Sequence, residues 1–114
     1  MSENKLVRQH NRICMLLDYY GDLLTSRRQQ ILNMSIENDL SLSEIAEKLE
    51  ISRQAVHDNI QKAIDQLEQY EIVLGMATKD RALLNKLDQI MSNNQPEKNR
   101  EVILQLKELK AMIL

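Results

Sequence analysis

Apolar residues recur at steps of three and four along most of this 114-residue chain, the spacing that places side chains on one face of a helix. Within residues 42–67 the pattern breaks once, at the run Glu50-Ile51-Ser52. The apolar positions on the two sides of this break are Ile45, Ala46, Leu49, Val56, Ile60, Ala63, Ile64 and Leu67. The segment therefore predicts two amphipathic helices joined by a tight turn, the helix-turn-helix arrangement.

Polar residues at the expected helix ends fit the same two helices. Ser41 can cap the first helix, and Glu44, three residues later, completes a capping box. Ser52 is the natural N-cap of the second helix. The usual glycine of the turn is absent because Glu50 stands in its place. Either Glu50 adopts a left-handed backbone conformation at some cost, or the turn differs in detail.

Helical patterns also flank this motif. A stripe of apolar residues within 6–20 stops at Gly21, which predicts a helix end there. The next helix opens with either Thr25 or Ser26 as its cap. After the motif, the helical pattern continues as far as Gly75, which marks either a kink or a helix end.

Beyond Gly75, two apolar stripes are separated by the polar run at 92–96. Their members are Met76, Leu83, Leu87 and Ile90 before the run, and Val102, Leu106, Leu109 and Ile113 after it. Pro96 is well placed as the first residue of the second helix. Two such stripes around a short polar turn predict an antiparallel helical hairpin.

The composition agrees with an all-α protein. The chain has two glycines, one proline and no Trp or Phe, and it shows no β-branched alternation. We expect a helix-turn-helix domain over residues 1–75, with its core at 42–67, followed by the hairpin over 76–114. No apolar run approaches the roughly 20 residues of a spanning helix. The absence of an apolar signal segment and the lone Cys14 favour a cytoplasmic protein without membrane contact.

The formal net charge of −2 is unevenly distributed. Residues 25–75 hold five basic and nine acidic residues, a net charge of −4, whereas residues 76–114 hold seven basic and five acidic residues, a net charge of +2. The predicted helix-turn-helix thus lies in the most acidic part of the chain. Such a balance argues against a domain that grips nucleic acid by electrostatics alone.

The inventory of reactive side chains argues against an enzyme. The two histidines, His10 and His57, fall on different predicted helices. His10 and Cys14 are four residues apart and make half of a zinc site, but there is no second cysteine. We interpret Cys14 as a small buried apolar residue. No glycine-rich phosphate loop is present, so no cofactor and no metal are expected.

The candidate nucleic-acid-binding residues lie on the outer face of the second helix and at the start of an earlier one. They are Arg27, Arg28, Arg53, Gln54, His57, Gln61 and Lys62. Arginine pairs with guanine edges and glutamine with adenine edges in a major groove. Asp58 on the same outer face would repel phosphates. The alternative interpretation is a docking face for a protein or a ribonucleoprotein, with no contact to DNA.

Several segments resemble region four of bacterial sigma factors, in which a Thr-capped helix precedes the helix-turn-helix that reads promoter DNA. They are LLT at 23–25, LSLSEIAEKL at 40–49 and ISRQAVHDNI at 51–60. A fuller match in order and spacing is to the YlxM family of helix-turn-helix-like proteins of Gram-positive bacteria. It is carried by LLDYYGDLLT, SLSEIAE, SRQAVHDNI and the YE at 70–71.

The resemblance implies a regulatory role. Genes of that family neighbour those of the signal recognition particle GTPase and its receptor, which implies a part in this targeting pathway. The RNA or the GTPase of the particle would then be a partner, with the basic side chains of the hairpin as the expected RNA contacts. Sigma-factor activity is not expected, because the chain lacks room for the regions that bind polymerase and melt the promoter.

The hairpin stripes hold more large apolar residues than one short helix pair can hide. They must pack either on the preceding helices or on a second copy. Because an exposed apolar patch usually marks an interface, we expect a homodimer.

Overall fold

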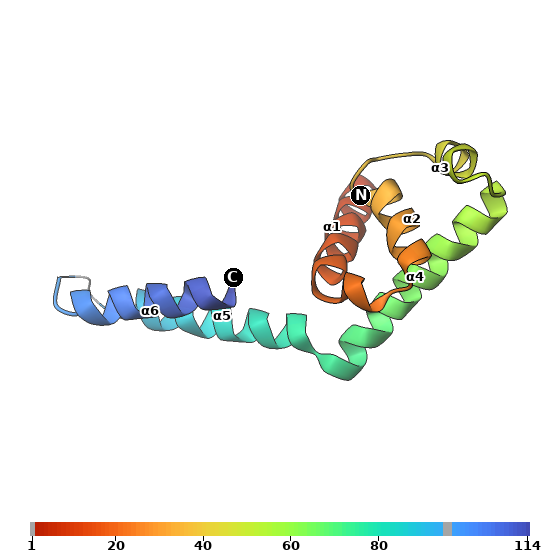
Figure 1. The fold of residues 1–114 in the computed structure, drawn as a ribbon. Helices are drawn as coiled ribbons and strands as arrows, with labels where there is room; N and C mark the ends of the chain where they lie inside the picture. Colours follow the sequence, from red (N-terminus) through yellow and green to blue (C-terminus); the bar gives the residue numbers. More distant parts are fainter. Residues whose placement is uncertain (1, 95–96) are drawn as a thin grey trace. The chain divides into compact units, whose positions relative to one another are not determined.

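The computed structural model describes residues 2–94 and 97–114, and every regular element within them is helical (Figure 1). The elements are α1 (Ser2–Tyr20), the short 3-10 helix η1 (Gly21–Leu23), α2 (Ser26–Ile36), α3 (Leu42–Leu49), α4 (Arg53–Leu74), α5 (Met76–Ser92) and α6 (Arg100–Ile113). The predicted all-α class is confirmed. The chain divides into two compact units, the helix-turn-helix unit Met1–Gly75 and the hairpin unit Met76–Leu114. No described helix is long and apolar enough to cross a membrane.

The long helix α4 is the spine of the helix-turn-helix unit, because α1, α2 and α3 all pack against it (Figure 1). One core cluster joins α1, the residue after η1, α2 and α4 through Ile13, Leu16, Leu17, Tyr20, Leu24, Leu32, Ala63 and Leu67. A second cluster joins α2, α3 and α4 through Ile31, Ile45, Ala46 and Val56. The neighbours Ile31 and Leu32 belong to different clusters, so α2 connects the two cores along the length of α4.

Two polar contacts fix α1 against the second half of α4. The buried Tyr20 hydroxyl donates a 2.5 Å hydrogen bond to the carboxylate of Glu71, which is itself only 7% exposed. The Arg12 guanidinium donates two 2.7 Å hydrogen bonds to the Glu68 carboxylate. This hydrogen-bonded pairing lowers the pKa of Glu68 and raises that of Arg12. The pair is largely exposed, so it orients α1 more than it stabilises the fold.

The hairpin unit is an antiparallel pair in which α6 lies alongside α5 (Figure 1). The Lys110 ammonium donates a 2.7 Å hydrogen bond to Asp88 across the pair. Near the turn, the Asn99 side-chain amide donates to that of Asn94. The second helix begins at Arg100, with Asn99 as its N-cap. The predicted helix start at Pro96 lies outside the described residues.

The predicted apolar stripes of the hairpin were partly wrong in register. Among the described residues of this unit, the buried apolar ones are Ala77, Leu87 and Ile103, whereas Leu83, Val102 and Leu109 are exposed. The reason is that both helices carry more apolar positions than one seam needs. Two neighbouring stripes then satisfy the same three-and-four spacing, and spacing alone cannot say which stripe faces the partner helix.

The helix caps follow the predictions closely. Thr25 caps α2 by accepting from the Arg28 backbone N–H, which decides between the two predicted caps in favour of Thr25. Ser41 and Glu44 form the reciprocal capping box of α3. Ser52 caps α4, and Gly75 ends it in the left-handed conformation, at a φ of 62°.

The turn between α3 and α4 places Glu50 in the left-handed region, with φ 56° and ψ 43°. This is the first of the two alternatives that the missing glycine left open. The Ile51 backbone N–H reaches back to the Ala46 carbonyl, and the Glu50 N–H bonds the Glu47 carbonyl. These bonds make a Schellman ending of α3. Ile51 then packs against the second core cluster, which closes the turn.

The strain at Glu50 generates a stability prediction. Replacing Glu50 by Gly removes the steric cost of a left-handed Cβ, and we expect the free energy of unfolding to rise by about 0.5–1 kcal/mol. Chemical denaturation measures this change. The control is Glu50→Ala, which removes the carboxylate but keeps the Cβ, and should give no comparable gain. Equal gains for the two variants would contradict a strained Glu50.

Candidate nucleic-acid interface

The first turns of α4 are fixed on one side by the core and expose polar side chains on the other. Val56 is fully buried against Ile45 and Ala46 of α3, so the helix cannot rotate about its axis without exposing it. The Ser52 cap and the closed turn fix where α4 begins. The opposite side of the helix is the reading face, which we define as Arg53, Gln54, His57, Asp58, Gln61 and Lys62; all six side chains are exposed.

Three of the predicted site residues are brought together at one place. Arg53, Gln54 and His57 line an open hollow of about 480 Å³, together with Leu42 from the first turn of α3. Leu42 was not among the predicted site residues. It is half-buried, and the sequence offered it only as one more apolar residue at a helix start.

Hydrogen bonds along α4 hold much of this face in position. The Gln54 amide donates a 2.9 Å hydrogen bond to Asp58, and the Gln61 amide donates a 3.2 Å bond to Asp65. His57 Nδ1 lies 3.7 Å from the same Asp58 carboxylate, an ion pair only when the histidine is protonated. Asp58 therefore orients Gln54 in the hollow, a role that its spacing of four residues from Gln54 could have indicated.

Arg28 lies far from Arg53, near the second half of α4. The Arg28 guanidinium donates a 2.7 Å hydrogen bond to the side chain of Gln66, and Arg28 is half-buried. Gln66 lies roughly three and a half turns beyond Arg53 on α4, which is about 20 Å at the helical rise. Arg27 is exposed in the first turn of α2. The two arginines of α2 thus belong to a second basic position, away from the hollow.

The residues considered for a metal site do not make one in the described part of the chain. The Cys14 sulfur lies 3.5 Å from His10 Nε2 on the outer side of α1. No group of three or more His, Cys, Asp or Glu side chains that could hold a metal ion occurs among the described residues. Cys14 is half-buried, not fully enclosed as a core residue would be.

A family model described as "Putative helix-turn-helix protein, YlxM / p13 like" matches residues 7–109. This range includes both units. The chain belongs to this family, UPF0122. The match confirms the resemblance to the YlxM family that the sequence motifs showed. The description of this family names a helix-turn-helix and no catalytic activity.

Relatives from several bacteria agree with the assignment. A UPF0122 protein of Staphylococcus epidermidis is 43% identical over 112 residues, which cover 96% of this chain and 99% of the relative. A UPF0122 protein of Thermoanaerobacter is 41% identical over 87 residues, or 76% of this chain and 74% of the relative. A UPF0122 protein of Listeria innocua is 41% identical over 80 residues, or 70% and 73% of the two chains.

Proposed function

We propose that this protein is a regulatory helix-turn-helix protein that binds a specific nucleic-acid duplex through the first turns of α4. The observation that carries the proposal is the hollow lined by Arg53, Gln54, His57 and Leu42 on a rigidly held helix. The arginine and glutamine supply the donors and acceptors that read guanine and adenine edges, and an apolar side chain beside them suits a thymine methyl group.

The charge distribution determines how strongly this binding should depend on salt and how weak its non-specific part should be. Five basic residues belong to the helix-turn-helix segment at 25–75: Arg27, Arg28, Lys48, Arg53 and Lys62. If all five met phosphates, the logarithmic salt slope would be about −4.5 at most for duplex DNA. Acidic side chains on the same helices reduce the attraction further. We therefore expect weak non-specific binding and a complex that depends on base contacts.

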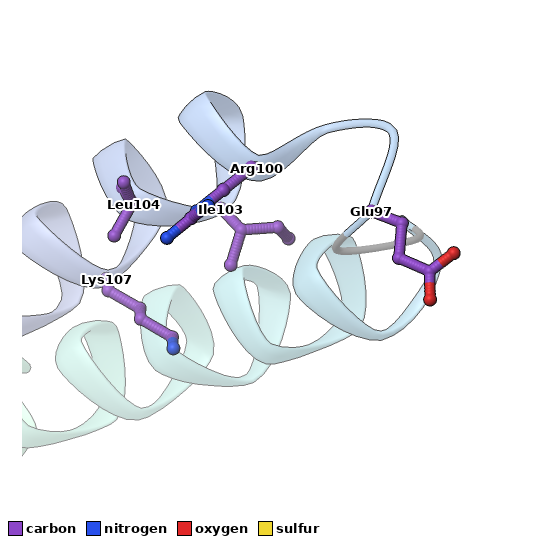
Figure 2. Close-up of a pocket in the computed structure, with 5 residues that line it drawn as sticks. All are labelled: Glu97, Arg100, Ile103, Leu104 and Lys107. Atoms are coloured by element: carbon purple, nitrogen blue, oxygen red, sulfur yellow. The ribbon is translucent and has the colours of Figure 1, made fainter.

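A second candidate partner is the RNA or GTPase of the signal recognition particle, which the gene neighbourhood of the family implies. The supporting observation is the basic side of the hairpin unit. An open hollow of about 590 Å³ is lined by Glu97, Arg100, Ile103, Leu104 and Lys107. Figure 2 shows the cationic ends of Arg100 and Lys107 at this hollow, with the Glu97 carboxylate pointing away from them.

The hairpin offers a direct test of this second candidate. Reversing Arg100 and Lys107 to Glu should weaken binding to the particle's RNA at least tenfold in a titration, because both cations face one hollow. The matched control reverses Lys5 and Arg8, two exposed cations of α1, and should leave most of the affinity. Absence of binding to both the RNA and the GTPase would contradict a physical role in the targeting pathway.

The proposal for α4 is tested by in-vitro selection from a random duplex library at moderate salt. We expect an enriched motif, and Arg53→Ala should cost about 1–3 kcal/mol of binding free energy and relax one base position. Arg27→Ala is the control, since loss of a phosphate contact weakens all sequences alike and keeps the motif. No enrichment with folded protein would contradict DNA reading and favour a protein-binding adaptor.

A further inference from the structure

The reading face carries one acidic side chain, in a place that is unfavourable for a nucleic-acid contact. Asp58 lies in the second turn of α4, and 55% of its side-chain surface is open to solvent. A carboxylate there repels phosphate groups, and it loses its hydration when a duplex covers the face. A hydrogen-bond donor must then replace the lost water, because an unpaired buried charge is strongly unfavourable.

The side-chain amide of Gln54 supplies such a donor from within the protein. Its Nε2 atom lies 2.9 Å from Asp58 Oδ1, one helical turn further along α4. His57 Nδ1 lies 3.7 Å from the same oxygen, which is beyond hydrogen-bond distance. Within residues 2–94 and 97–114, Gln54 is therefore the one side chain that donates a hydrogen bond to Asp58.

This hydrogen bond fixes which way round the Gln54 amide lies. An ionised carboxylate is an acceptor only, so Asp58 attracts the amide nitrogen and repels the amide oxygen. Turning the amide by half a rotation about its last side-chain bond would bring two acceptors together. The groups of Gln54 that remain for a base are therefore one oxygen acceptor and one N–H donor.

An acceptor beside a donor matches the major-groove edge of adenine. Adenine offers N7 as an acceptor and its N6 amino group as a donor, and a glutamine amide binds both. Guanine offers two acceptors, O6 and N7. The amide must then either place its oxygen against one of them or turn both N–H groups toward the base. The first arrangement is repulsive, and the second deprives Asp58 of its donor.

We propose that Asp58 is a positioning residue, which restricts Gln54 to adenine and excludes guanine at the base pair that Gln54 reads. The inference rests on the proposed function of α4, because it concerns how the reading face selects a base. The carboxylate lowers the affinity for every duplex through phosphate repulsion. It lowers the affinity for guanine further, and specificity is this difference between affinities.

The same helix repeats the glutamine–aspartate pair seven residues later, and this second pair is a matched control. Gln61 Nε2 lies 3.2 Å from Asp65 Oδ1, again at a spacing of four residues. Gln61 is about 10 Å further along the helix than Gln54, and the hollow is lined by neither Gln61 nor Asp65. Both pairs stabilise the helix in the same way. The two pairs thus differ in whether the glutamine lies at the hollow.

Competition titrations with the full chain test the proposal. In-vitro selection first gives the motif, and Gln54→Ala identifies the base pair whose preference depends on Gln54. Duplexes that differ only at this pair are then compared. The wild type should favour adenine over guanine at least about tenfold. Asp58→Ala should bind both duplexes more tightly and reduce the preference to about threefold or less, because the amide can turn. Asp65→Ala should keep the wild-type preference.

A measurement without DNA tests the hydrogen bond itself and shows whether the variants are folded. In the ¹⁵N-labelled chain, Asp58→Ala should shift the side-chain amide resonances of Gln54 and leave those of Gln61 in place. Asp65→Ala should do the reverse. Unchanged Gln54 resonances in Asp58→Ala would overturn the positioning role. Circular dichroism should show the same helix content in both variants, since both aspartates lie at the surface.

The outcomes separate this inference from the proposed function. If Asp58→Ala binds more tightly but keeps the full preference for adenine, the carboxylate acts by repulsion alone and the inference is wrong, while base reading by α4 stands. A wild-type preference for guanine or cytosine at the pair that Gln54 reads would also overturn the inference. Equal loss of preference in Asp58→Ala and Asp65→Ala would overturn the local role of Asp58. A selection that enriches no motif would contradict the proposed function itself.

Discussion

The burial of one side of α4 is the constraint on which the helix-turn-helix unit depends. The same helix contributes Val56 to one core cluster and Ala63 and Leu67 to the other, and α1, α2 and α3 all pack on it. Once these positions are buried, the rotation of the helix is fixed. The six residues of the reading face, on the opposite side of the helix, must then point outward. The exposure of the reading face is thus a consequence of core packing.

Local signals in the sequence were sufficient for most of this unit. The capping box at Ser41, the N-cap at Ser52 and the left-handed Glu50 depend on residues within a few positions of one another, so their chemistry is visible in the sequence. The hydrogen bond from Tyr20 to Glu71 was not predictable, since it joins positions 51 residues apart. An acidic residue in a helical pattern is normally expected at the surface, and only its partner explains its burial.

The candidate site was predicted in its residue types but not in its arrangement. Sequence placed Arg53, Gln54 and His57 on one helix face, and the structure places them around a common hollow with Leu42. It also separates them from Arg28, whose side chain is engaged by Gln66. In the hairpin, two neighbouring apolar stripes fit the same spacing, so only packing showed which one forms the seam.

The two units divide the chemistry of the chain between them. The helix-turn-helix unit offers specific donors and acceptors on an acidic background, which suits base reading with little help from phosphate attraction. The hairpin unit offers the hollow lined by Arg100 and Lys107, whose two cations suit an anionic partner.

The most direct test of the central proposal is an NMR titration of the full ¹⁵N-labelled chain with a mixed-sequence DNA duplex at low salt. Binding through the first turns of α4 predicts that the largest amide shift changes lie between Ser52 and Gln61 and at Leu42. Changes confined to the hairpin unit, or no changes at saturating duplex, would contradict the assignment of α4 as the nucleic-acid-binding helix.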